Sequence, residues 1–324
     1  MPRAVIADEL GQPSHYSLRD HDPGPPRAGE LRIAIKAAGV SFVDVLVSEG
    51  RYQIRPSVPF IPGSECAGIV EALGAEVTGF SVGQRVVATG WHGMFAEVAN
   101  VPAQSAWPIP DALSFEEAAC FVVSYTTSWH GLVDRAGLKA GESLLVLGAG
   151  GATGLAAVQI GAWLGAYVIA SASSEAKRAI ASAGGAASTV NSASPGWRDD
   201  VRAANGGRPV DVIFDPVGGE STERAFRTLG WNGRHLIVGF PAGIAALPTN
   251  LPLLKGASLI GVYLGGLGEN EPERARANQE RLFELAGQGL FKPAIAHRCP
   301  LENFADAMTE AARGDTAGRI VLIP

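Results

Sequence analysis

Residues 143–174 read SLLVLGAGGATGLAAVQIGAWLGAYVIASASS, and this stretch decides the fold. An apolar run at 143–147 ends in a glycine-rich turn, a helical stretch follows at 153–164, and a second apolar run begins at Tyr167. Continuous apolar runs are typical of parallel strands covered on both faces. No charge lies between Glu142 and Glu175, but the central glycines favour a strand, a turn and a buried helix over a membrane span. The stretch predicts a βαβ unit.

The glycines of this turn have the spacing of a dinucleotide site. Ala149 stands where the pattern G-x-G-x-x-G usually has its first glycine. Such a turn lets the backbone approach a pyrophosphate at the positive end of the following helix. A tight turn without a ligand is the alternative. The residues expected to contact the cofactor here are Gly148, Gly151, Ala152, Thr153 and Gly154.

The end of the second strand indicates which cofactor binds. A site that prefers NAD places Asp or Glu about 20 residues beyond the glycines. This chain has Ser173 and Ser174 there, followed by Lys177. Hydroxyls and a cation suit the 2′-phosphate of NADPH, which a carboxylate would repel. We therefore predict NADPH, with the alternative that Ser174 only caps the next helix and Lys177 is solvated.

Outside this unit the chain changes character near Ser114. Before it, short strands alternate with Pro- and Gly-rich turns, as in an antiparallel β domain. After it, strands alternate with helices, which specifies a parallel sheet. A helix at 273–288 and a strand at 320–323 should return the chain to the first domain. The expected strands lie at 31–37, 68–73, 85–88, 143–147, 167–171, 210–214, 234–239 and 258–263, the helices at 153–164, 175–183 and 222–229, and a turn at 231–233.

Composition excludes several classes of protein. The net charge of −6, with no run of like charges, argues against a nucleic-acid partner. Cys66, Cys120 and Cys299 are far apart and lack metal-ligand spacing, so neither a disulfide framework nor a structural zinc is expected. The N-terminus lacks the apolar stretch of a signal peptide. We expect a cytoplasmic protein with no membrane partner.

Several stretches resemble the zeta-crystallin-like quinone oxidoreductases of the medium-chain dehydrogenase/reductase superfamily. They include GVSFVDVLVSEGRYQ at 39–53, PFIPGSECAGIVEALG at 59–74, TTSWHGL at 126–132 and DVIFDPVGG at 211–219. The resemblance implies an α/β protein with a GroES-like, mainly β catalytic domain and a doubly wound Rossmann domain that binds NADPH, with the active site in the cleft. The implied ranges are 1–122 with 266–324 for the first domain and 123–265 for the second.

The resemblance also implies that zinc is absent. Zinc alcohol dehydrogenases of the superfamily hold their metal at positions that match Ser41, Ser64 and Val123 here. None of these is a good Zn²⁺ ligand. Hydride should therefore pass from NADPH to an acceptor that is already electron-poor, such as a quinone or an α,β-unsaturated carbonyl compound.

The resemblance further suggests individual site residues. Ser41, Asp44, Tyr52 and Thr127 match the residues that line the nicotinamide and substrate cleft. The Tyr52 hydroxyl is the candidate donor to the acceptor oxygen, and a packing role is its alternative. Thr127 would bind the nicotinamide or its ribose unless it only packs, and Asp44 also reads as a residue that fixes a neighbouring loop. At strand ends, Gly239, Phe240 and Tyr263 should face the cofactor, whereas Arg319 reaches a phosphate or is solvated.

Two rival functions remain open at this point. One is reduction of an enoyl thioester of coenzyme A, and the other is binding of NADPH without catalysis. The apolar strand at 258–263 should lie at a sheet edge, and an open edge invites pairing with another chain. We therefore expect a homodimer.

Overall fold

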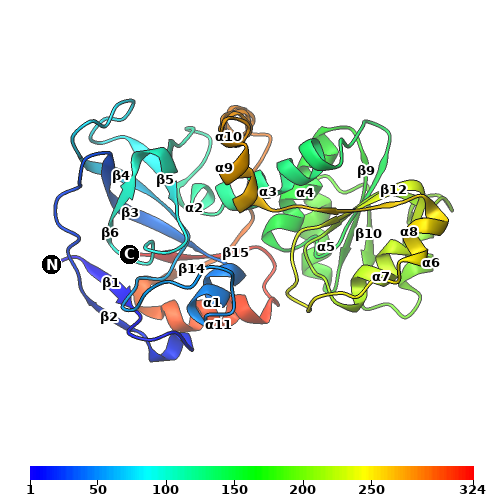
Figure 1. Cartoon of the computed structure of the whole chain (residues 1–324), viewed down its shortest axis with the longest axis horizontal. Coiled ribbons are helices and arrows are strands. Elements are labelled where there is room, and N and C mark those ends of the chain that lie inside the picture. The colour runs from blue at the N-terminus through cyan, green and yellow to red at the C-terminus, as the bar shows by residue number, and fades with distance from the viewer. The chain divides into compact units, whose positions relative to one another are not determined.

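The βαβ unit expected at 143–174 forms the centre of a six-stranded sheet. It consists of β8 (Ser143–Val146), α4 (Ala152–Trp163) and β9 (Tyr167–Ala172) in the computed structural model, which describes all 324 residues. All strands of the sheet run parallel, in the order β10-β9-β8-β11-β12-β13. Figure 1 labels β9, β10 and β12 of this sheet, with α4 among the helices around it. This is the doubly wound order of dinucleotide-binding domains. The other strands are β10 (Ser188–Asn191), β11 (Val210–Asp215), β12 (Leu229–Ile237) and β13 (Ser258–Gly261).

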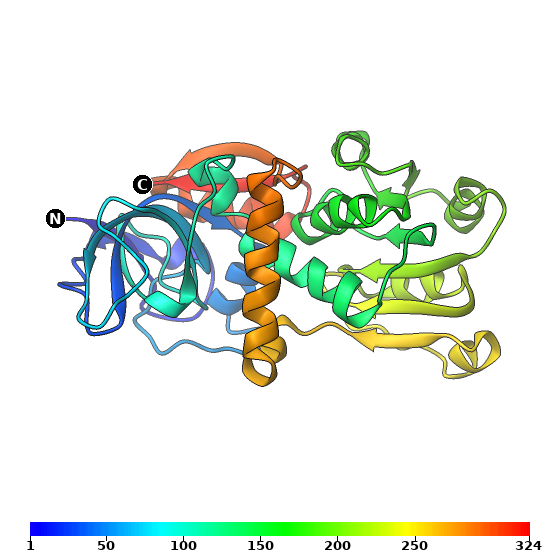
Figure 2. The same ribbon diagram turned by 90° about the horizontal axis from the view of Figure 1, so that it is seen from above.

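Helices cover both faces of this sheet (Figure 2). One face packs through an apolar cluster that includes Ile169, Ile213 and Phe226, and it is covered by α6 (Trp197–Ala204), α7 (Glu220–Phe226) and α8 (Asn250–Lys255). On the other face Gly161 of α4 lies close to Leu144 and Val168. Successive strand residues point to opposite faces, so an apolar run can serve both. The remaining helices of this part are α3 (Val122–Trp129), a π-helix (His130–Arg135), α5 (Glu175–Ala183), α9 (Leu264–Asn270) and α10 (Pro272–Gly287).

The turn expected at 231–233 does not precede β12 but lies inside it. Asn232 has a φ of 59°, and the pairing of β11 with β12 shifts register between Val210 and Val212. The turn residues therefore bulge out of a strand that begins at Leu229. Bulges of this kind keep a strand paired on both sides of an irregularity.

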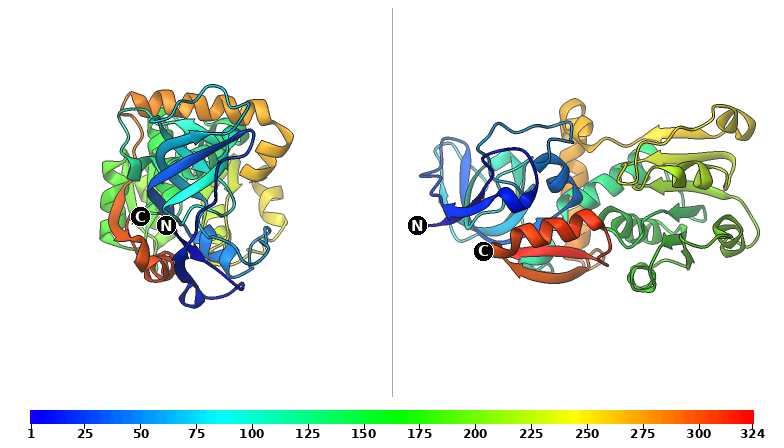
Figure 3. Two further views of the ribbon diagram at one scale, coloured as in Figure 1. Left: turned by 90° about the vertical axis from the view of Figure 1, so that its left-hand side faces the viewer. Right: turned by 90° about the horizontal axis from the view of Figure 1, so that it is seen from below.

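A mixed seven-stranded sheet is the second core, and most of its strands are antiparallel. Its order is β14-β15-β3-β4-β5-β7, with β6 also paired to β3, and only β14 and β15 are parallel to each other. Helix α11 lies alongside β14 and β15 (Figure 3). A separate two-stranded sheet consists of β1 (Arg3–Ile6) and β2 (Ser17–Asp20). The other elements of this part of the chain are β3 (Glu30–Val40), α1 (Phe42–Ser48), β4 (Glu65–Leu73), β5 (Arg85–Thr89), β6 (Val98–Pro102), β7 (Ala106–Pro108), α2 (Phe115–Ala118), β14 (Ile295–Pro300), α11 (Phe304–Arg313) and β15 (Arg319–Ile323).

The chain divides into two compact units, which we call unit 1 and unit 2. Unit 1 comprises Met1–Val123 and Ala286–Pro324, and unit 2 comprises Ser124–Leu285. Unit 2 therefore continues to Leu285, beyond the boundary expected at residue 265. The cause is α10, whose Asn278 donates to Asp134 over 2.8 Å and whose Gln279 pairs with Thr126, so most of this helix is tied to helices of unit 2.

Candidate active site

The turn after β8 has the geometry of an anion site. Gly148 has a φ of 56°, a conformation that favours glycine. Helix α4 begins at Ala152 after the N-cap Gly151, and no side chain caps it. The N–H groups of its first turn have no partners within the helix, and they lie at the positive end of the helix dipole. The turn can therefore hold a phosphate group through backbone donors alone.

Two glycines of the turn leave no room for a side chain. A Cβ atom added at Gly154 would lie 2.2 Å from the carbonyl oxygen of Gly148, and one added at Gly150 would lie 2.4 Å from Cβ of Lys177. The second distance shows that Lys177 packs directly against the turn. Ala149, in contrast, is fully buried and donates to the carbonyl of Ser171 over 3.1 Å. Its methyl group fits, which explains why the first glycine of the usual pattern is dispensable here.

The hydroxyl of Ser174 caps α5. It accepts a hydrogen bond from the backbone N–H of Lys177 over 3.3 Å, so the capping role considered for this residue is confirmed. Ser173 is exposed at the end of β9. Arg178 turns back to the carbonyl of Ala172. Ser173 and Lys177 are the other polar side chains at this strand end, next to the glycine turn.

Two further loops lie beside the turn at the carboxyl ends of the strands. Val217, in the loop after β11, is 2.9 Å from the position of a Cβ on Gly148. Gly239, after β12, approaches the carbonyl oxygen of Pro216, and Phe240 beside it is 47% exposed. The three loops therefore lie next to one another at the carboxyl ends of the strands, where open α/β sheets bind ligands.

Two other residues of unit 2, Tyr263 and Thr127, are expected to contact the cofactor. Tyr263 follows β13 as the N-cap of α9, is 53% exposed, and its ring lies against Gly265 and Gly266. Thr127 lies in the middle of α3 and is half-buried. The geometry leaves the expected cofactor contacts of both residues as predictions.

In unit 1, Ser41 and Asp44 form a capping box at the start of α1. The carboxylate of Asp44 accepts from both the N–H and the hydroxyl of Ser41, each over 2.7 Å, and the Ser41 oxygen accepts from the N–H of Asp44 over 3.2 Å. Asp44 is only 2% exposed, and burial raises the pKa of its carboxyl group. Asp44 therefore fixes the loop before α1, which is the structural role that the sequence suggests for it.

Tyr52 lies in the loop after α1. Its ring is tilted against the ring of Trp91, with a centroid distance of 5.9 Å. The side chain is half-buried. This contact orients the ring, and it leaves the role of the hydroxyl as a prediction.

A buried charge cluster in unit 1 escaped the sequence analysis. It consists of Asp44, Glu65, Cys120 and Arg319, whose side chains influence one another electrostatically. Burial raises the pKa of Glu65 to about 8, although Arg319 and the N–H groups of Val122 and Val123 oppose the shift. Burial likewise raises the pKa of Cys120 to about 11. Two carboxyl groups are thus buried within electrostatic range of one guanidinium group.

The expectation for Arg319 is wrong in both of its forms. Arg319 neither reaches a phosphate nor lies in solvent, because its side chain is 9% exposed and sits beside Glu65 and Asp44. A signal was available, since a single arginine at the start of an otherwise apolar strand needs a buried partner. The partner could not be identified, because Glu65 lies more than two hundred residues away in sequence.

No group of three or more His, Cys, Asp or Glu side chains in the chain is arranged to hold a metal ion. All three cysteines are free thiols, and Cys66 and Cys120 are buried. Burial raises the pKa of Cys66 to about 12, which keeps it protonated. Separately, no helix is both long and apolar enough to cross a membrane.

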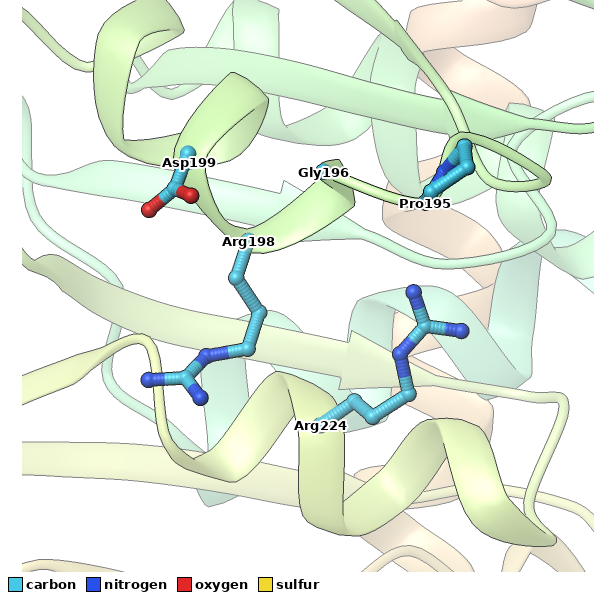
Figure 4. A pocket seen from close by; sticks show the side chains of 5 residues that line it. All are labelled: Pro195, Gly196, Arg198, Asp199 and Arg224. Atoms are coloured by element: carbon cyan, nitrogen blue, oxygen red, sulfur yellow. The ribbon is translucent and has the colours of Figure 1, made fainter.

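A pocket of about 300 Å³ opens on the surface of unit 2 (Figure 4). The guanidinium group of Arg224 lies over the ring of Trp197, 5.4 Å from its centroid. The pocket combines arginine and aspartate side chains, and none of the expected site residues lines it. Its lining residues are Pro195, Gly196, Arg198, Asp199 and Arg224.

Comparisons with known proteins agree with this architecture. Residues 27–111 match the family model "Alcohol dehydrogenase GroES-like domain", and residues 152–280 match "Zinc-binding dehydrogenase". The chain is 32% identical to the quinone oxidoreductase-like protein 2 homolog of Nematostella vectensis, over 99% of this chain and 88% of that protein. It is 36% identical to quinone oxidoreductase-like protein 2 of Bos taurus, over 99% of this chain and 92% of that protein.

A solved structure gives the same result for the fold. The Escherichia coli quinone oxidoreductase complexed with NADPH superimposes with a TM-score of 0.90 at 27% identity, and the match covers 99% of this chain and 100% of that one. The GroES-like unit and the Rossmann-type unit are thus both confirmed. The chain belongs to the quinone oxidoreductase branch of the medium-chain dehydrogenase/reductase superfamily, a family of oxidoreductases.

Proposed function

We propose that this oxidoreductase uses NADPH to reduce quinones or α,β-unsaturated carbonyl compounds, and that it does so without zinc. The contact of Lys177 with the glycine turn carries the proposal, because the first carbons of this cationic side chain pack against a turn that can bind a phosphate group. The NADPH bound by the similar E. coli enzyme supports the same cofactor here.

The residues of unit 2 fit this cofactor. The free N–H groups at Ala152, Thr153 and Gly154 would bind the diphosphate, and Lys177 with the Ser173 hydroxyl would bind the 2′-phosphate. The Ser174 hydroxyl accepts from the Lys177 N–H, yet it keeps its own proton to donate. The backbone of Gly239 and Phe240, with Thr127 and Tyr263, would contact the nicotinamide end.

Unit 1 supplies the candidate contacts for the acceptor. When bound, NADPH supplies a hydride from C4 of its nicotinamide ring. The Tyr52 hydroxyl would donate a hydrogen bond to the acceptor oxygen, where negative charge develops as hydride arrives. The Ser41 hydroxyl donates its hydrogen bond to Asp44. Toward the substrate it can therefore only accept a hydrogen bond. Orientation of the two reactants would supply most of the rate enhancement.

Reaction without a metal follows from the residues at the metal positions of the zinc enzymes. Ser41 and Ser64 interact with Asp44, and Val123 has an apolar side chain, so none offers a thiolate, imidazole or carboxylate. Quinones and enones accept hydride without the Lewis acid that alcohol oxidation needs.

An acceptor panel tests the proposal. We expect loss of NADPH with phenanthrenequinone and with a simple enone, at rates that exhaustive chelation does not change, and no stoichiometric zinc by elemental analysis. Turnover with crotonyl-coenzyme A alone would instead favour the enoyl thioester reductase. One tightly held zinc per chain would refute the metal-free mechanism.

We also propose that the protein forms a homodimer through β13. This strand pairs only with β12, so its other edge is open. Leu259 on β13 is 48% exposed, and the neighbouring Trp231, Leu253 and Leu254 are 75%, 79% and 71% exposed. An open apolar edge of this kind favours pairing with the same strand of a second copy about a two-fold axis.

A further inference from the structure

A buried polar triad lies at the carboxyl end of β11. It consists of Asp215 on β11, His235 on β12 and Thr222 on α7, with exposures of 0%, 0% and 2%. None of the three carries a role in the function proposed above. Buried polar groups cost stability unless they are fully hydrogen-bonded, so such a group needs an explanation.

Asp215 uses both of its oxygens. Oδ1 accepts from the N–H groups of Val217 and Gly218, each over 2.9 Å, and Oδ2 accepts from the Thr222 hydroxyl over 2.7 Å. His235 Nε2 lies 3.0 Å from Oδ2. Burial alone would raise the pKa of Asp215, but the hydrogen bonds from His235 and Gly218 hold it below its ordinary value. The group is therefore a carboxylate with four donors.

The two ring nitrogens of His235 have different surroundings. Nδ1 is buried and has no hydrogen-bond partner, and the ring stacks on Phe226 at a centroid distance of 5.8 Å. A proton on Nδ1 would be an unsatisfied buried donor. Nε2 faces a carboxylate oxygen, which can only accept, so Nε2 carries a proton and donates it in a hydrogen bond to Asp215.

The donors that Asp215 holds belong to the loop that touches the glycine turn. This loop, residues 216–219, packs Val217 against Gly148, and Gly218 lies against the carbonyl oxygens of Gly239 and Gly243. Gly218 and Gly219 have φ values of 75° and 59°, so the loop has little intrinsic preference for its shape. A carboxylate that binds two successive N–H groups is what fixes such a loop.

We propose that Asp215 is a positioning residue of the cofactor site, which sets the loop 216–219 against the glycine turn and so determines how tightly the nucleotide binds. Thr222 and His235 act through Asp215, because each donates to its Oδ2 atom. This inference rests on the function proposed above, since it assumes that NADPH occupies the turn.

Variants at two of the residues test the inference, with the dissociation constant of NADPH measured by titration calorimetry on the full chain. Asp215→Asn should weaken NADPH about tenfold or more, the loss expected for a charge-assisted hydrogen bond. Thr222→Val removes only one donor to Asp215 and should weaken the binding of NADPH less. The KM of NADPH should rise while the KM of the acceptor stays unchanged.

Conservative variants separate positioning from mere stability. His235→Gln can still donate to Asp215 and should bind NADPH like the wild type, whereas His235→Phe removes one donor and should resemble Thr222→Val. Asp211→Asn is the matched control, because Asp211 accepts from the N–H and hydroxyl of Ser143 at the opposite end of the same strand. It should leave the dissociation constant unchanged.

The outcomes are distinguishable. A wild type that binds no NADPH overturns the proposed function together with this inference. The inference alone is overturned if the wild type binds NADPH and both Asp215→Asn and Thr222→Val bind it as tightly as the wild type does. This holds even if denaturation shows both variants to be less stable. Should Asp215→Asn fail to fold, Thr222→Val decides.

Discussion

Replacing Glu65 by Gln should make the protein less sensitive to rising pH. Glu65 is 1% exposed and accepts from the N–H of Val122 over 2.5 Å, and its pKa is about 8 against an ordinary 4.5. In the unfolded chain the group ionises near its ordinary pKa, while in the folded chain it keeps its proton to about 8. The unfolded state therefore binds fewer protons in this window, and stability falls as pH rises.

The size of the effect follows from the two pKa values. Each pKa unit corresponds to about 1.4 kcal/mol. The free energy of unfolding should lose up to about 5 kcal/mol between the ordinary pKa of 4.5 and about 8, with no penalty below that window. Glutamine cannot ionise, and its carbonyl oxygen still accepts from Val122. Arg319 keeps the electrostatic attraction of Asp44 in the variant.

Urea denaturation of both proteins across this pH range measures the effect. The wild type should lose stability with pH, and Glu65→Gln should show a flatter profile and be the more stable protein at the alkaline end. Glu117→Gln is the matched control, because Glu117 also accepts a backbone N–H, from Ser114 over 2.8 Å, but lies nearer to solvent. It should shift stability without changing the slope. Parallel profiles for wild type and Glu65→Gln would refute the reasoning.

Three further predictions concern the cofactor, the acceptor and the assembly. In titration calorimetry, Lys177→Ala should weaken the binding of NADPH about tenfold and leave the binding of NADH unchanged, since it removes a charge-assisted contact to the 2′-phosphate. Equal affinities of the wild type for the two cofactors would contradict this. Tyr52→Phe should slow steady-state turnover about tenfold or more with an enone and less with a quinone, because an enolate concentrates charge on one oxygen; unchanged rates with both acceptors would return Tyr52 to packing against Trp91. Leu259→Lys should convert a dimer into a monomer in sedimentation, whereas a wild type of monomer mass at every concentration would end the dimer proposal.

Local patterns in the sequence were sufficient to predict the nucleotide-type unit. The glycine turn, the helix after it and the cation at Lys177 lie within 35 residues of one another, and each has a sequence signature that depends on neighbours in the chain. The structure adds the packing of Lys177 against Gly150, which no spacing rule contains.

Contacts between distant segments could not be predicted in the same way. Glu65 stands at the start of the apolar run CAGIV, and Arg319, which influences it electrostatically, lies at the other end of the chain. Asp215 and His235 come from adjacent parallel strands, so their pairing depends on sheet register, which the sequence does not reveal. The polar residue in the apolar run RHLIVG was nevertheless a usable signal, because a histidine in a buried strand needs a partner.

The most direct test of the account follows the hydride itself. An enone should be reduced by the wild-type protein with NADPH that carries deuterium at both C4 positions of the nicotinamide ring, and the product analysed by mass spectrometry. The account predicts one deuterium per product molecule, on the carbon β to the carbonyl group, with or without a chelator. Product without deuterium, or no product, would contradict direct hydride transfer from NADPH to the acceptor.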